Sequence, residues 1–234
     1  MLDVPRFEQP DDVTCGPTCL AQVYEYFGYE KSLAEVIRET RRNPDGGTLA
    51  VYLGTSALKN GFQPTIYSYN LRVFDPSWRE LEAEEMVAKL QQRTRFVRSE
   101  KLRESLEAYC AYLQMGGKVR FDELEGDLFV RLLAKGQPIL TGLSATYLYQ
   151  TKREYRNEYD DIRGEPAGHF VVISGYDPET DGFVVRDPSV HIPFSRTGKY
   201  SVPTERLITA ILLGDVTYDA VLLVVGKRKR RHTI

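Results

Sequence analysis

The most informative part of the sequence is residues 9–28, which read QPDDVTCGPTCLAQVYEYFG. From Cys15 onward, apolar residues recur with the spacing of an amphipathic helix. Pro17 suits the first turn of such a helix, and Gly28 suits the position just after its end. We therefore expect Cys15 at a helix N-terminus, where the helix dipole favours the nucleophilic thiolate form. Taken alone, the position also fits a small buried cysteine that only packs.

A histidine and an aspartate near the other end of the chain make a reactive Cys15 the better interpretation. We expect strands over 168–176 and 182–187, joined by a turn, with His169 opening the first and Asp187 ending the second. Opposed residues of a hairpin have a constant index sum, and the sum for this pair, 356, places Pro178 inside the turn. The side chains are then neighbours, within a residue or two of this register, and the carboxylate can fix the imidazole tautomer. The alternative is that each side chain is satisfied separately at a strand end.

Gln9 lies six residues before Cys15. Its side-chain amide can fold back and donate an N–H to an oxyanion that develops beside Cys15, whose own backbone N–H would be the second donor. The alternative for an isolated glutamine is a solvated loop residue.

These residues carry a family resemblance. Residues 9–28 resemble the N-terminal motif of the C39-like (bacteriocin-processing-type) cysteine peptidases, which have the papain-like fold. Residues 168–172 resemble the family's histidine strand and 186–188 its Asp-Pro turn, within similar regions at roughly 5–65 and 122–226. The resemblance is to stand-alone bacterial members. It implies the following roles: Cys15 as nucleophile, His169 as general base and acid, Asp187 as orienting group, and Gln9 as oxyanion donor.

The predicted elements indicate an α+β fold with a helical N-terminal half packed on an antiparallel C-terminal sheet, because helices come first and strands cluster late. We expect a single peptidase domain over residues 1–226 and a basic tail over 227–234. A helical insertion is expected around 70–120, with a helical stretch over 76–114 that breaks near 93–99. Residues 144–167 contain four tyrosines and no core-like periodicity, and we expect a lid-like surface loop there.

Composition excludes several classes. Hydrophobic residues make up 42% and charged residues 27% of the 234, which excludes disorder as the main state. No apolar run approaches the ~18 residues of a membrane span, and no signal peptide is visible. Three cysteines cannot form a disulfide framework, so we expect a cytoplasmic setting. The net charge of −2 predicts no nucleic-acid partner, with the basic residues 227–231 as a weak alternative contact for nucleic acid or an anionic membrane.

The sequence thus predicts a peptidase or amidase that attacks a peptide or protein substrate through an acyl-enzyme thioester, without metal or cofactor. The same residues could serve an acyltransferase or peptide ligase, or a non-catalytic peptide-binding module. Cys19, one helical turn after Cys15, is expected in the core, with a resolving thiol as the alternative. Cys110 is expected to pack. His191 is expected to be a polar loop residue, with an approach to the site as the alternative.

Overall fold

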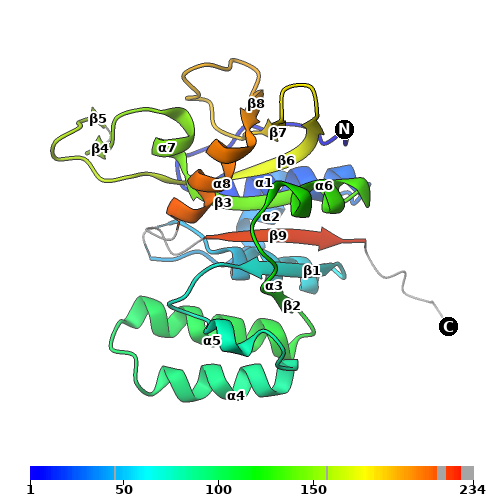
Figure 1. Ribbon diagram of the computed structural model, residues 1–234, viewed down its shortest axis with the longest axis vertical. Coiled ribbons are helices and arrows are strands. Elements are labelled where there is room, and N and C mark those ends of the chain that lie inside the picture. The colour runs from blue at the N-terminus through cyan, green and yellow to red at the C-terminus, as the bar shows by residue number, and fades with distance from the viewer. Residues whose placement is uncertain (45, 157, 215–219, 228–234) are drawn as a thin grey trace.

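The computed structural model of the chain describes residues 1–44, 46–156, 158–214 and 220–227. Within these ranges the centre of the molecule is a seven-stranded sheet in the order β2-β1-β9-β3-β6-β7-β8 (Figure 1). Neighbouring strands pair antiparallel, except for β1 and β2, which run parallel. The strands are β1 (Gln63–Ser68), β2 (Lys118–Arg120), β3 (Ile139–Ser144), β6 (Gly168–Asp177), β7 (Gly182–Arg186), β8 (Lys199–Pro203) and β9 (Val221–Gly226).

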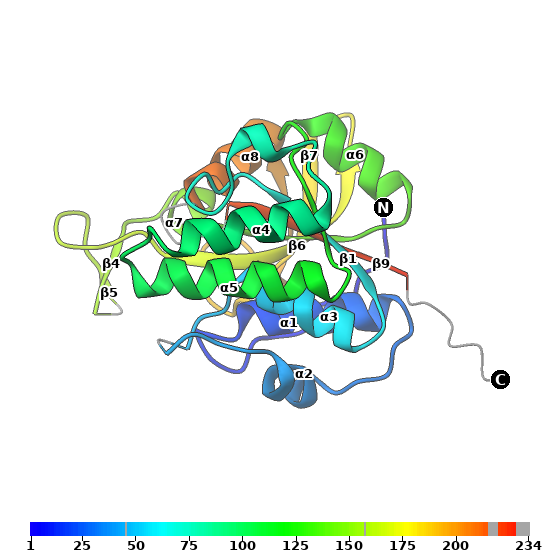
Figure 2. The same cartoon turned by 90° about the horizontal axis from the view of Figure 1, so that it is seen from below.

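Helices cover both faces of this sheet (Figures 1 and 2). In β9, Val221, Leu223 and Val225 belong to the core on one face, and Leu222 and Val224 to the core on the other. This alternation, with both faces buried, explains why the strand reads as a continuous apolar run. The first face carries α1 (Cys15–Tyr26), α3 (Ala50–Lys59), α4 (Ala83–Thr94) and α5 (Glu100–Gln114), and the second α6 (Gly126–Ala134), α7 (Ala145–Tyr149) and α8 (Thr204–Leu212).

The first helix begins and ends where the sequence predicts. α1 starts at Cys15, and Gly28 follows its end with φ of +66°, a left-handed conformation that favours glycine. Gly16 must also be small, because a Cβ there would lie 2.4 Å from Cγ2 of Thr48. Because Gly16 has no Cβ, the N-terminal turn of α1 can lie close to the segment that contains Thr48. The short helix α2 (Leu33–Glu39) follows.

Most of the helical prediction for 76–114 is confirmed, including the break, but residues 79–82 are not helical. A single 3-10 turn, η1 (Pro76–Trp78), precedes α4, and α4 and α5 are separated by residues 95–99. α5 packs on α3, and α4 lies outside α5 (Figure 1). The buried Tyr112 of α5 places its hydroxyl 2.9 Å from the carbonyl oxygen of Pro64 and 3.1 Å from that of Lys118. This contact ties the helical pair to the edge of the sheet.

Residues 144–167, expected to be a loop, contain structure. They begin with α7, which Ser144 caps by accepting a hydrogen bond from the N–H of Tyr147 at 3.3 Å. A small hairpin of β4 (Glu154–Tyr155) and β5 (Glu158–Tyr159) follows. The elements are too short to give a periodic pattern, which is why the sequence does not predict them.

The α+β class is confirmed, and two further strands extend the expected sheet. β1 and β2 come from the N-terminal half and the middle of the chain, and they join the C-terminal strands through β9. Neither β2 nor β8 is predicted from the sequence. No helix in the described ranges has the length and apolar character needed to cross a membrane. The basic tail 227–234 lies outside the described residues, apart from Lys227.

Candidate active site

His169 and Asp187 meet at the open end of the β6–β7 hairpin. The Nε2 atom of His169 lies 2.8 Å from Oδ1 of Asp187. The register differs from the expected sum by two, within the expected range of a residue or two: Val172 pairs with Arg186, so opposed residue numbers sum to 358 rather than 356. A bulge between Ile173 and Gly175 shifts the register once more toward the turn. The two side chains therefore meet diagonally across the ladder, a distance that long side chains can still span.

The Asp187 carboxylate is fully buried and accepts four hydrogen bonds. Oδ1 accepts from His169 and from the backbone N–H of Ser189 at 2.9 Å. Oδ2 accepts from the hydroxyls of Tyr149 at 2.7 Å and Tyr200 at 2.6 Å. Burial works to raise the pKa of this carboxyl, but the imidazolium of His169 and these hydrogen bonds outweigh burial and hold the pKa below its usual value. The group is therefore an ionised acceptor.

His169 is held in its charged form. Burial works to lower the pKa of the imidazole, while the Asp187 carboxylate, its hydrogen bond and the adjacent thiol of Cys15 raise it; the net effect raises the pKa of His169 to about 10. Because the Asp187 carboxylate can only accept, Nε2 carries a hydrogen. Nδ1 is then the ring nitrogen that remains for Cys15.

Cys15 is the first residue of α1, and its exposed fraction is 9%. One turn later, the thiol of Cys19 donates to the carbonyl oxygen of Phe170 at 3.3 Å, which fixes α1 against the strand that carries His169. Burial raises the pKa of Cys19 well above its usual value, so it remains a thiol. These observations favour the packing role of Cys19. Cys110 also packs, with its thiol 3.9 Å from the carbonyl oxygen of Val87.

Gln9 lies near Asp187 and is held by one hydrogen bond from its backbone and one from its side chain. Its backbone N–H donates to the carbonyl oxygen of Pro188 at 2.9 Å, next to Asp187. Its side-chain Nε2 donates to the carbonyl oxygen of Asp11 at 2.9 Å. An amide nitrogen carries two hydrogens, so the bond to Asp11 leaves the second for another acceptor. The buried Oε1 atom accepts no hydrogen bond from any described residue.

A cleft of about 550 Å³ opens beside His169 and Gln9. Segment 144–167 supplies much of its wall, and Ser189 and His191 also line it. His191 therefore does approach the site. The cleft is lined by Gln9, Asp12, Ala145, Thr146, Tyr149, Thr151, Glu154, Tyr159, Ala167, Gly168, His169, Ser189 and His191.

Three partners of Asp187 cannot be found from the sequence alone. Tyr149 is visible only as one of four tyrosines in segment 144–167. Tyr200 lies on β8, which the sequence does not predict, although the alternation of Tyr200 and Val202 is a weak strand signal. The N–H of Ser189 is a backbone group, and a backbone group leaves no compositional signal.

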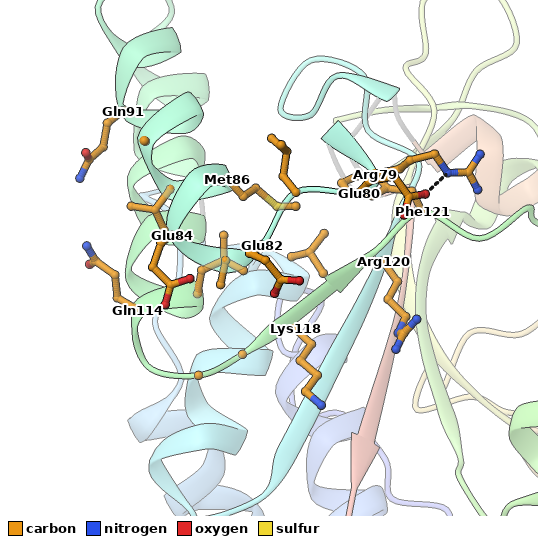
Figure 3. Close-up of a pocket in the computed structure, with 18 of the residues that line it drawn as sticks. Arg79, Glu80, Glu82, Glu84, Met86, Gln91, Gln114, Lys118, Arg120 and Phe121 are labelled. Carbon is orange, nitrogen blue, oxygen red and sulfur yellow. Dashed lines mark ion pairs between the residues drawn. The ribbon is translucent and has the colours of Figure 1, made fainter. Parts of the chain in front are cut away.

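A larger groove, of about 1110 Å³, lies between α4 and β2 (Figure 3). Three strands separate β2 from β6 in the sheet, so this groove is remote from His169. Its walls carry both acidic side chains, such as Glu82 and Glu84, and basic ones, such as Lys118 and Arg120 (Figure 3). Among the residues that the structure describes, no group of three or more His, Cys, Asp or Glu side chains could hold a metal ion.

The comparisons with known proteins agree with this architecture. The sequence model of the Peptidase_C39 like family matches residues 1–97 and 105–202. A search of curated proteins found no match. A solved structure from Bacillus anthracis, described as a C39-like peptidase, is 16% identical with a TM-score of 0.50 and covers 98% of each chain. This likeness shows the papain-like fold.

Two further solved structures are similar at lower scores. Xylellain, a cysteine protease from Xylella fastidiosa, is 14% identical with a TM-score of 0.49, over 96% of this chain and 84% of that one. A double glycine motif protease from an AMS/PCAT transporter, in complex with the leader peptide, is 14% identical with a TM-score of 0.46. Its alignment covers 97% of this chain and 93% of that one.

Proposed function

The chain belongs to the Peptidase_C39 like family, and from this we propose that it is a thiol-dependent peptidase or amidase whose catalytic triad is Cys15, His169 and Asp187. One observation carries the proposal. A cysteine at a helix N-terminus lies beside an imidazole that is hydrogen-bonded to a buried carboxylate, and the imidazole lines an open cleft. This is the order of contacts that activates a thiol nucleophile.

The reaction follows from the proton positions. The proposed reaction begins when the thiol proton of Cys15 passes to His169 Nδ1, which gives a thiolate beside an imidazolium. The sulfur attacks the amide carbonyl carbon, and the C–N bond breaks as His169 Nδ1–H gives its proton to the departing amine. A thioester then joins the acyl group to Cys15. Water, deprotonated by His169, hydrolyses the thioester and restores the thiol, while Asp187 stabilises the imidazolium throughout.

Gln9 is proposed to donate its second Nε2 hydrogen to the oxyanion, together with the backbone N–H of Cys15. Removing one such donor typically costs about 10²–10³ in rate. We therefore expect Gln9→Ala to slow acylation by about that factor with little change in KM. Gln91→Ala, an exposed glutamine on α4, is the matched control and should change neither constant. A raised KM with an unchanged kcat in Gln9→Ala would instead identify a substrate-binding residue.

The charges of the cleft suggest which peptides it accepts. Asp12 and Glu154 line it, no Lys or Arg does, and neither carboxylate forms an ion pair with a described residue. A peptide with a Lys or Arg side chain near the scissile bond gains from these charges, whereas an acidic peptide is repelled. We expect a preference of about 3- to 10-fold for basic over isosteric neutral peptides, since exposed pairs contribute ~0.2–1 kcal/mol each. Glu154→Gln and Asp12→Asn should each reduce it.

The control for this preference is Glu158→Gln, which changes a carboxylate of the same hairpin that does not line the cleft. The preference should decline as salt rises. Equal cleavage of basic and acidic peptides by the unmodified protein would contradict the assignment.

The proposed function is tested by intact-mass detection of the acyl-enzyme after rapid acid quench, with a peptide library as substrate. The mass increase must map to Cys15 and be absent from Cys15→Ala. If the protein retains a peptide but neither cleaves it nor forms a covalent adduct, it is a binding module instead. If the acyl group is transferred to an added amine rather than to water, the protein is an acyltransferase.

A further inference from the structure

Two tyrosine hydroxyls converge on one oxygen of the Asp187 carboxylate. Tyr149 comes from α7 and Tyr200 from β8, and both donate to Oδ2, at 2.7 and 2.6 Å. The other oxygen, Oδ1, is the one that faces His169. The two tyrosines therefore hold the carboxylate from the side opposite to its catalytic contact.

The chemistry of these donors matters because the carboxylate is fully buried. Burying a charge is costly unless hydrogen bonds replace its hydration. A phenol supplies such a bond without a countercharge, so it does not compete with the imidazolium for the carboxylate. The nearby cation, Arg6, donates instead to the backbone carbonyl oxygens of Asp187 at 3.1 Å and Ser189 at 2.8 Å.

Aromatic contacts hold the rings of both tyrosines in place. Phe194 contacts both rings edge-on, with centroids 5.9 Å from Tyr149 and 5.0 Å from Tyr200. The ring of Tyr149 also lies 6.3 Å from that of His169 and lines the cleft. Aromatic contacts of this kind restrict ring rotation and therefore fix where each hydroxyl points.

We propose that Tyr149 and Tyr200 are positioning residues that hold the Asp187 carboxylate in the orientation, and with the charge distribution, that His169 requires. The inference rests on the proposed function. Each hydroxyl withdraws part of the negative charge from the carboxylate. The imidazolium is then stabilised enough to form the ion pair, yet remains acidic enough to protonate the leaving amine. The titratable or charged groups around the pair are Cys15 and Cys19 of α1, Tyr149 of α7, Tyr200 of β8 and Arg6 of the N-terminal segment.

The test uses Tyr149→Phe, Tyr200→Phe and the double variant in the full chain, because phenylalanine keeps the ring packing and removes only the hydroxyl. The matched control is Tyr176→Phe, which removes a hydrogen bond of the same type: Tyr176 donates to Asp181 at 2.9 Å at the far end of the β6–β7 hairpin. Two quantities are measured against pH. One is the rate of Cys15 alkylation by iodoacetamide, resolved by peptide mass, and the other is kcat and KM on a peptide substrate.

We expect each single variant to lower kcat by ~3- to 10-fold with unchanged KM. Without one donor, more of the carboxylate charge acts on the imidazolium, so the alkaline step of the alkylation profile should move to higher pH. The double variant should lose more than the product of the single effects, because each single variant retains one anchor. Tyr176→Phe should match the unmodified protein.

Profiles and rate constants that match the unmodified protein in both single variants would overturn the inference, even if the double variant fails to fold. So would loss of activity with an unmoved alkaline step, which indicates a structural role only. Alkylation needs no substrate. If the unmodified protein turns over no peptide, the proposed function fails, while the alkylation profile still decides the role of the two tyrosines.

Discussion

Cys15→Ala should abolish peptide turnover and leave the fold intact. The substitution removes one sulfur atom at the end of a helix, so we expect no more than a small change in Tm. The loss of kcat should be about 10⁴-fold or more, because the variant lacks the proposed nucleophile. Cys19 cannot replace it, since its thiol is buried and bound to Phe170.

His169→Ala should be nearly as damaging, and the double variant Cys15→Ala/His169→Ala hardly worse than either single change. Residues that act as a unit have strongly non-additive effects. Single-turnover kinetics on a peptide substrate measures all three variants, with Cys110→Ala as the control for loss of a buried thiol elsewhere. Turnover retained by Cys15→Ala would show that the nucleophile has been assigned wrongly.

Two substitutions of Asp187 should separate the effect of its charge from the effect of its hydrogen bonds. Asp187→Ala leaves the donors of His169, Ser189, Tyr149 and Tyr200 without their acceptor, and breaking a buried pair of this kind costs about 3–5 kcal/mol. We expect that loss in the free energy of unfolding, together with a ~10³-fold decrease in kcat/KM.

Asp187→Asn should be much milder, because the amide can reproduce every contact. The N–H of Ser189 can only donate, so it fixes the amide oxygen at the Oδ1 position, where it also accepts from His169. The amide nitrogen then donates to Tyr149 and Tyr200, whose hydroxyls can accept as well as donate. We expect a decrease in kcat/KM of only about 10-fold and little change in urea denaturation. Asp181→Asn, at the remote turn, is the control; equal losses in the Asn and Ala variants would contradict this account.

The sequence reveals the parts of the candidate site that depend on local patterns. The placement of Cys15 follows from helix signals, and the hairpin that carries His169 and Asp187 follows from alternating runs around a turn. Its exact register could not be predicted, because no pattern fixes the turn at residues 178–181, between the paired Asp177 and Gly182, or announces the bulge beside Gly175. The tyrosine anchors could not be predicted either, since α7 and β8 approach Asp187 only through tertiary packing. For the same reason, the sequence does not predict the parallel pairing of β1 with β2.

The position of β9 in the sheet has a consequence for the order in which the protein matures. β9 lies between β1 and β3, and it is synthesised after every other strand of the sheet. Until it emerges from the ribosome, the part containing β1 and β2 and the part containing β3, β6, β7 and β8 each present an open edge where β9 belongs. Cys15 would then leave the ribosome long before His169 and Asp187 can be fixed beside it. The Cys15 thiol would therefore lack its partners until the β6–β7 hairpin has been synthesised and has packed on α1.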